Sequence, residues 1–187
     1  MNNVIKMILT LTVIGIFSGG LLSEVSNWAT PKIKKNQKAE IEKAIFVVHP
    51  NGKYYEVVQN NKVEIYKVFD AEKNLIGYTI VNSGNGFQGK IKIMTGVNIK
   101  LNKITSIEIL EQVETPGLGT KITEEPFKNQ FQEITALPNI IWVKGKSLEQ
   151  SNEIQTITGA TISSKSVVEI VNAGIEKARE SKNRGLL

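Results

Sequence analysis

The sequence predicts an α+β fold in which an N-terminal transmembrane helix is followed by an antiparallel sheet and a long C-terminal helix. Three observations predict it. The chain is apolar from Val4 to Leu22 except for Lys6, two threonines and Ser18. Between residues 54 and 110, short runs of alternating apolar and polar residues follow one another with few helical segments between them. From Thr161 to about Lys182, apolar residues recur at helical spacing.

The apolar N-terminal segment is long enough to cross a membrane. At about 1.5 Å rise per residue, Val4–Leu22 spans about 28 Å as a helix. Lys6 lies near one end, where its side chain can reach the interface, and Trp28 follows at an interfacial position. A cleaved signal peptide is the alternative, but no clean small-x-small cleavage site follows the apolar run. We therefore expect a retained anchor over 1–28 and a stalk helix over 29–50.

Charge gives its own indication of orientation. Only Lys6 and the α-amino group lie at the N-terminal end of the span, whereas Lys32, Lys34, Lys35 and Lys38 follow it. The positive-inside rule therefore favours a cytoplasmic C-terminal domain. The same lysine cluster is suited to contact with a membrane surface. The net charge is +5, but the lysines are dispersed and not interleaved with aromatic residues, which argues against a nucleic-acid partner.

The domain expected over 51–187 is built from short strands and few helices, joined by polar turns. We expect strands at 54–58, 62–69, 75–81, 89–99 with a break at Gly96, and 104–110; turns at 59–61, 71–74 and 101–102; a short helix at 124–132; a buried strand at 140–143; and the final helix, burying Val167, Val168, Val171, Ile175 and Ala178.

The composition excludes several kinds of chemistry. The chain has no cysteine, one histidine (His49) and one aspartate (Asp70). Disulfides, thiolate-ligated iron–sulfur clusters and thiol nucleophiles are therefore excluded. A histidine-rich metal site, a Ser-His-Asp triad or a carboxylate–histidine dyad is hard to assemble from so few residues. His49 precedes a Pro-Asn-Gly turn and is expected in a loop. We predict no catalytic and no metal-ligating residue, so any chemistry belongs to a bound cofactor.

The most informative motif is the string Ile157–Ser164, which leads into the C-terminal helix. It places Thr158, Gly159, Ala160, Thr161 and Ser163 around the first turn. The unpaired N–H groups and partial positive charge of a helix start suit a phosphate, which a threonine there could bind or carry covalently. The alternative is that one of the hydroxyls is an ordinary N-cap.

Two further segments are rich in glycine. Gly84–Ile91 contains a glycine-aromatic-glycine turn that enters a strand, which allows a close backbone approach to a ligand or simply forms a bulge. Glu114–Gly119 reads Glu-Thr-Pro-Gly-Leu-Gly, in which Pro-Gly supplies a tight turn around a ligand or a turn alone.

These three motifs, in this order after a membrane segment, resemble the FMN-binding domain found in the G subunit of the Rnf complex and in the C subunit of the sodium-pumping NADH:quinone reductase. The chain length is closer to that of the Rnf protein. In this family the threonine that closes the Ser/Thr-Gly-Ala-Thr core is esterified by the phosphate of FMN. That position is Thr161 here, so the resemblance implies a covalent FMN on Thr161.

The resemblance also implies the remaining cofactor contacts. The helix start would hold the phosphate, and the 114–119 loop would lie against the isoalloxazine ring with a lysine nearby to stabilise reduced flavin. The residues assigned to FMN in this way are Glu114, Thr115, Gly117, Leu118, Gly119, Lys121, Thr158, Gly159, Ala160 and Ser163. One departure concerns recognition by the FMN transferase, because the family usually has aspartate where this chain has Gln155.

The function implied is that of an electron-relay subunit. The complex passes electrons between reduced ferredoxin and NAD⁺ and couples this to sodium or proton movement, so enzyme activity is expected of the complex and is not assigned to the isolated chain. The implied partners are the other membrane subunits, with the FMN transferase for maturation. The implied location is the cell membrane, with a single pass and an extracytoplasmic FMN domain, opposite to the charge rule. Two alternatives are a stand-alone anchored flavoprotein serving an extracytoplasmic reductase and a non-redox anchored binding module.

Overall fold

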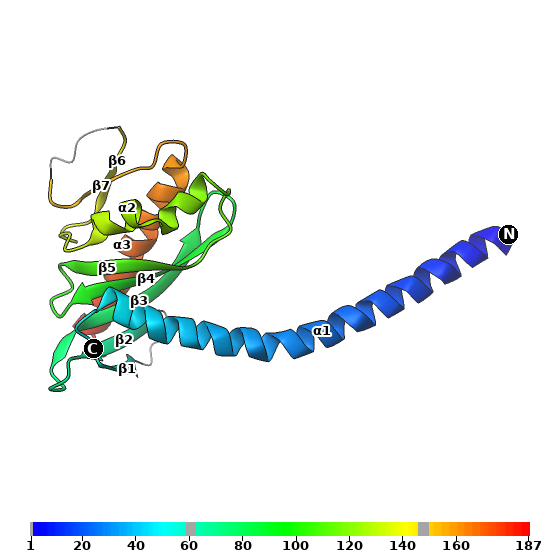
Figure 1. Ribbon diagram of the computed structural model, residues 1–187, viewed down its shortest axis with the longest axis horizontal. Helices are drawn as coiled ribbons and strands as arrows, with labels where there is room; N and C mark the ends of the chain where they lie inside the picture. Colours follow the sequence, from blue (N-terminus) through cyan, green and yellow to red (C-terminus); the bar gives the residue numbers. More distant parts are fainter. Residues whose placement is uncertain (1, 59–62, 146–149) are drawn as a thin grey trace. The chain divides into compact units, whose positions relative to one another are not determined.

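The computed structural model describes residues 2–58, 63–145 and 150–187, and the chain divides into two compact units, Met1–Ile41 and Glu42–Leu187. The helix α1 runs from Asn2 to Val48 without a break, so the predicted anchor and stalk belong to one element (Figure 1). By length and composition it is the one helix among the described residues that could cross a membrane. Beyond the apolar run, the ammonium of Lys32 lies 3.6 Å from the centroid of the Trp28 ring, a cation–π contact typical of an interfacial segment.

The second unit contains a five-stranded sheet in which every strand pairs antiparallel with its sequence neighbours. The strands are β1 (Tyr54–Val58), β2 (Glu64–Phe69), β3 (Leu75–Asn85), β4 (Lys90–Asn98) and β5 (Ile104–Glu111). The predicted α+β class and antiparallel sheet are confirmed. The turn expected at 59–61, together with Lys62 of the second predicted strand, lies outside the described residues.

Two strands differ from the prediction at glycines. β3 continues to Asn85 instead of ending at Val81, because Gly84 and Asn85 still pair with Ile91 and Lys90 of β4. Gly96 does not break β4; the strand continues and the register with β5 shifts between Gly96 and Val97. A glycine inside a strand commonly marks a bulge or a register shift. The sequence pattern alone therefore predicts a break where the strand in fact continues.

The segment after β5 has more elements than the sequence indicates. One short helix was expected at 124–132, but the chain forms three short pieces, η1 (Gly119–Thr123), α2 (Glu125–Lys128) and η2 (Asn129–Phe131). The strand expected at 140–143 is β6 (Ile141–Val143), which pairs in parallel with a strand that was not predicted, β7 (Glu153–Gln155).

The prediction that this strand is buried was wrong. Ile141 and Trp142 are exposed because β6 belongs to a two-stranded ribbon outside the main sheet. Only Ile140, directly before the strand, is buried. The side-chain amide of Asn172 accepts from the N–H of Ile140 and donates to its carbonyl, both at 2.9 Å. In the apolar run 140–143, Ile140 is thus buried and held by Asn172, and the strand that follows it is largely exposed.

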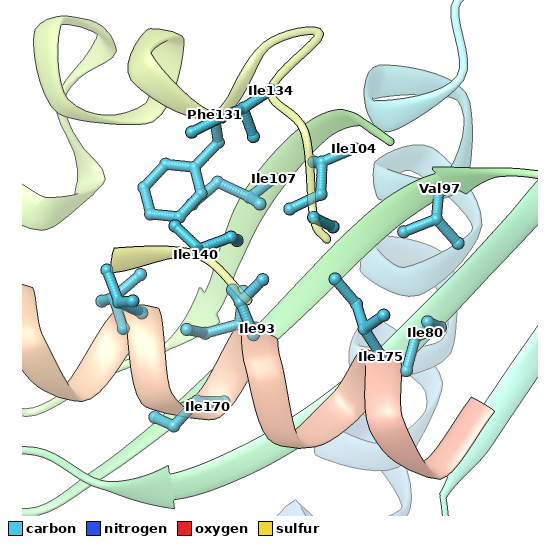
Figure 2. Packing of buried hydrophobic residues seen from close by; sticks show 14 of the residues in the cluster. Ile80, Ile93, Val97, Ile104, Ile107, Phe131, Ile134, Ile140, Ile170 and Ile175 are labelled. Atoms are coloured by element: carbon cyan, nitrogen blue, oxygen red, sulfur yellow. The ribbon is translucent and has the colours of Figure 1, made fainter. Parts of the chain in front are cut away.

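The core lies between the sheet and the last helix, α3 (Thr161–Asn183). Figure 2 shows Ile170 and Ile175 of α3 in the same buried cluster as Ile80 and Ile93 of the sheet. All five residues predicted to face the core on this helix are buried: Val167, Val168, Val171, Ile175 and Ala178. Burial of this continuous apolar surface supplies most of the domain's stability.

His49 joins α1 to the domain and is buried, with only 3% of its surface exposed. It lies directly after the helix, as the Pro-Asn-Gly turn predicted, and its Nε2 is 3.0 Å from the carbonyl oxygen of Tyr78, to which the neutral ring donates. Gly77 leaves room for the ring, since a Cβ there would lie 2.8 Å from His49 Cε1. Burial lowers the pKa of His49 from its ordinary value of 6.5, although the backbone hydrogen bond partly opposes this.

We expect the free energy of unfolding to fall as the pH drops below about 6.5, because unfolded His49 takes up a proton there and the buried ring does not. One such proton changes stability by at most about 1.4 kcal/mol per pH unit, between the lowered pKa and 6.5. Urea unfolding at several pH values measures the slope. His49→Asn should reduce it, and an equal slope in that variant would assign the pH dependence to other groups.

Candidate functional site

A cavity of about 470 Å³ opens beside the start of α3. Its walls come from the β3–β4 turn, the loop after β5, the segment after β6 and the residues on both sides of the start of α3. The lining residues are Phe87, Thr115, Leu118, Gly119, Lys144, Gly145, Thr156, Thr158, Gly159, Ala160, Thr161, Ile162 and Ser163. Its volume lies within the range of small-molecule sites.

The start of α3 is open to this cavity. Ala160 occupies the N-cap position with φ −131° and ψ 37°, and no side-chain hydrogen bond caps the helix among the described residues. The alternative in which Thr158, Thr161 or Ser163 serves as the N-cap is therefore not what the structure shows. The first-turn N–H groups, at Thr161, Ile162 and Ser163, have no acceptor earlier in the helix, so they give the cavity wall a partial positive charge.

Thr161 is the first residue of α3 and is partly exposed in the cavity wall. Gly159, two residues earlier, has φ +85°, a conformation that favours glycine and turns the chain into the helix. The Ala160 N–H bonds to the carbonyl of Ile157 at 3.0 Å, which closes this turn. Ser164 fixes it further by donating to the Ala160 carbonyl at 2.9 Å and accepting from the Ile157 N–H at 3.1 Å.

The loop after β5 forms another wall. The carbonyl of Thr115 accepts from the N–H groups of Leu118 and Thr120, both at 3.2 Å. Gly117 has φ +75° and completes the turn. Leu118 then reaches the other motif, because a Cβ at Gly159 would lie 3.3 Å from Leu118 Cδ2. Two segments that are more than 40 positions apart in the sequence therefore meet at the cavity.

The structure brings together most of the residues that the sequence assigned to a cofactor. Eight of them line the cavity: Thr115, Leu118, Gly119, Thr158, Gly159, Ala160, Thr161 and Ser163. Three do not line it. Glu114 is buried behind the wall, Gly117 lies at the exposed turn, and Lys121 is exposed in η1. The roles assigned to all eleven in FMN binding remain predictions.

Five lining residues were absent from the predicted set: Phe87, Lys144, Gly145, Thr156 and Ile162. Phe87 was visible in the glycine-aromatic turn, and Ile162 lies beside Thr161 in the motif. Lys144 and Gly145 carried no sequence signal, because only the fold brings the segment after β6 to this cavity.

The chemistry of the walls fits a flavin mononucleotide. The helix start supplies N–H donors for a phosphate, and the exposed side chains of Phe87, Leu118 and Ile162 supply apolar surface for a ring. Thr156 is buried, lines the cavity, and its Oγ1 has no hydrogen-bond partner among the described residues. An unpartnered buried hydroxyl is costly, so a polar group of a ligand would relieve a real penalty there.

The fold and the cavity define a ligand-binding α+β domain in which a helix start faces the ligand space. The family model of the FMN-binding domain matches residues 86–176, which include the 114–119 loop and the 157–164 helix start. The resemblance predicted from the sequence is confirmed. Among solved structures, NqrC of Shewanella oneidensis shares the fold, with a TM-score of 0.57, 19% identity and coverage of 68% of this chain and 67% of that one. The C subunit of the Na⁺-translocating NADH-quinone reductase of Parabacteroides distasonis gives a TM-score of 0.54 with 26% identity, covering 60% and 59%.

The relatives by sequence are components of ion-translocating complexes. The chain is 26% identical over 183 residues to the G subunit of the ion-translocating oxidoreductase complex of Methanosarcina acetivorans, covering 94% of each chain. It is 36% identical over 124 residues to the G subunit of the Na⁺-translocating ferredoxin:NAD⁺ oxidoreductase complex of Acetobacterium woodii, covering 65% of this chain and 59% of the relative. The proton-translocating counterpart in Clostridium ljungdahlii is 28% identical over 177 residues, with 94% and 92% covered.

Proposed function

We propose that this chain is an electron-relay subunit of a membrane-bound ferredoxin:NAD oxidoreductase complex, with FMN attached covalently to Thr161. The complex would couple electron transfer to sodium or proton translocation, as the names of the relatives state for those proteins. The FMN-binding domain and the G-subunit relatives support the cofactor and the type of complex. FMN, when bound, supplies reversible electron transfer.

The observation that carries the proposal is the position of Thr161. It is the first residue of an uncapped helix and forms part of the wall of a ligand-sized cavity. The N–H groups of Thr161, Ile162 and Ser163 would hold the remaining oxygens of a phosphate carried by the Thr161 hydroxyl. Forming the ester would break the O–H bond of Thr161 and one P–O bond of the FMN phosphate, and the proton and the departing oxygen would leave as water. The product therefore differs from chain plus FMN by one water.

The other walls serve the flavin ring. Phe87, Leu118 and Ile162 bury ring surface and exclude water. Thr156 Oγ1 can hydrogen-bond a polar group of the cofactor. Lys144 lines the cavity and would add a positive charge there, beside the role in stabilising reduced flavin that the resemblance implies for Lys121.

We propose an extracytoplasmic position for the domain, anchored by α1 and assembled with the other membrane subunits of the complex. A covalent bond suits that location, because it keeps the cofactor where free FMN is not replenished. The lysines after the span favour the opposite side by charge alone. Contacts with partner subunits would then fix the orientation. Maturation requires an FMN transferase that accepts Gln155 in place of aspartate.

The test is the intact mass of the full chain, purified from membranes of cells that contain an FMN transferase, followed by peptide mapping. We expect an added mass of FMN less water on the peptide that contains Thr161. An unmodified mass, with no flavin after gentle purification, would contradict the proposal. Copurification with other membrane subunits from native membranes is expected, and a flavin-loaded chain that purifies alone would instead indicate a stand-alone flavoprotein.

A further inference from the structure

We infer that Glu114 is a positioning residue, whose buried carboxylate joins the three segments around the cavity and fixes the first turn of α3 that presents Thr161. The effect on flavin attachment rests on the proposed function. The contacts of Glu114 are made within the chain and require no flavin. Glu114 would act on the helix start through its hydrogen bond with Ser163, and two glycines leave the space for its side chain.

The hydrogen bonds of Glu114 reach across the cavity walls. Only 4% of its surface is exposed. Its Oε1 accepts from the backbone N–H of Gln88 in the β3–β4 turn, at 3.0 Å. Its Oε2 accepts from the Oγ of Ser163, the third residue of α3. One carboxylate on the loop after β5 therefore connects the other two motif segments, and Ser163 uses its hydroxyl for this bond.

Two glycines leave the space that the carboxylate occupies. A Cβ at Gly86 would collide with Glu114 Oε1. A Cβ at Gly119 would lie 2.8 Å from Glu114 Cβ and 2.9 Å from both Glu114 Oε2 and Ser163 Oγ. Real Cβ atoms essentially never approach other atoms this closely. Glycines from two of the motifs thus leave the space in which a single side chain of the second motif lies.

Hydrogen bonds hold the buried side chain of Glu114. None of the ion pairs formed among the described residues includes it. A desolvated carboxylate is costly unless it is hydrogen-bonded. The N–H of Gln88, the hydroxyl of Ser163 and the positive end of α3 offset this cost. The two contributions from α3 are present only while its first turn stays against the loop. The hydrogen bond between Glu114 and Ser163 therefore favours the position of the helix start in which the buried carboxylate keeps its donor.

We would measure the initial rate of flavin attachment to the full chain by the FMN transferase, for wild type, Glu114→Gln, Ser163→Ala and the double variant. Each single change should lower the rate about tenfold, because it weakens a charge-assisted hydrogen bond that holds the first turn. The double variant should lose little more, since both changes remove the same contact.

Asn172→Ala is the matched control. Asn172 lies on the same helix and holds Ile140, but it does not line the cavity. We expect it to lower the thermal midpoint at least as much as Glu114→Gln while leaving the attachment rate within about twofold of wild type. If attachment in all variants simply follows the thermal midpoint, Glu114 is a stabilising residue only and the inference fails.

Hydrogen exchange on the flavin-free chain tests the positioning separately from the proposed function. Amides in the peptide from Thr158 to Ser164 should exchange about tenfold faster in Glu114→Gln than in wild type, and those near Ile175 should not change. Unchanged exchange at the helix start overturns the inference even if wild type carries flavin. Faster exchange in a chain that never acquires flavin supports the positioning and overturns the proposed function.

Discussion

Thr161→Val is expected to lose all covalent flavin, seen as the absence of a fluorescent band after SDS electrophoresis. Valine has nearly the shape of threonine but no hydroxyl, so no ester can form. Thr161 is only partly buried, so the change should leave the domain folded. Intact mass should show the unmodified chain, and circular dichroism should match wild type.

Two neighbouring variants make this result specific. Thr161→Ser keeps a hydroxyl at the helix start and should retain attachment. Thr158→Val removes the other threonine hydroxyl of the motif in the cavity wall and should also retain it. If Thr158→Val lost the flavin while Thr161→Val kept it, the attachment site would be Thr158.

The largest effect on stability is expected for Phe131→Ala. Phe131 is fully buried, and its ring lies edge to face with that of Phe127, with 5.6 Å between centroids. Replacing a buried phenylalanine by alanine removes apolar contacts and leaves a cavity, which costs about 4 kcal/mol. Urea unfolding should show this loss, and the thermal midpoint should fall by roughly 10 °C.

Phe87→Ala is the matched control, because Phe87 is 58% exposed and lines the cavity. Its unfolding free energy should change by less than about 0.5 kcal/mol. The visible circular dichroism of the attached flavin should change instead, since one apolar wall of its site is lost. Equal destabilisation by the two variants would contradict the placement of Phe131 in the core.

The fold was predictable because its signals are local. Alternating residues define the strands of the sheet, and helical spacing defines α3 with its buried face. The errors arose where tertiary contacts decide. Ile141 is exposed because β6 pairs outside the main sheet, and β7 is too short to carry a period. Gly96 marks a register shift in a strand that continues, because β3 and β5 pair on both sides of it.

The site residues that belong to contiguous sequence motifs were predictable. The string 157–164 supplied Thr161 and its neighbours because one helix start contains them. Thr156 and Lys144 were missed because a hydroxyl without a partner, or a lysine after an exposed strand, is recognisable only once the walls are assembled. Glu114 was recognised by its motif, but its hydrogen bonds to Gln88 and Ser163 depend on long-range folding.

The cavity draws its walls from segments that begin at Phe87 and end at Ser163. An unfolded chain therefore contains the threonine but not its surroundings. Under the proposed function, FMN is attached only after the domain has folded. The fraction of chains that carry flavin therefore reports the fraction that has folded. A destabilised variant would then acquire less flavin during maturation. Fewer of its copies would be able to transfer electrons within the complex.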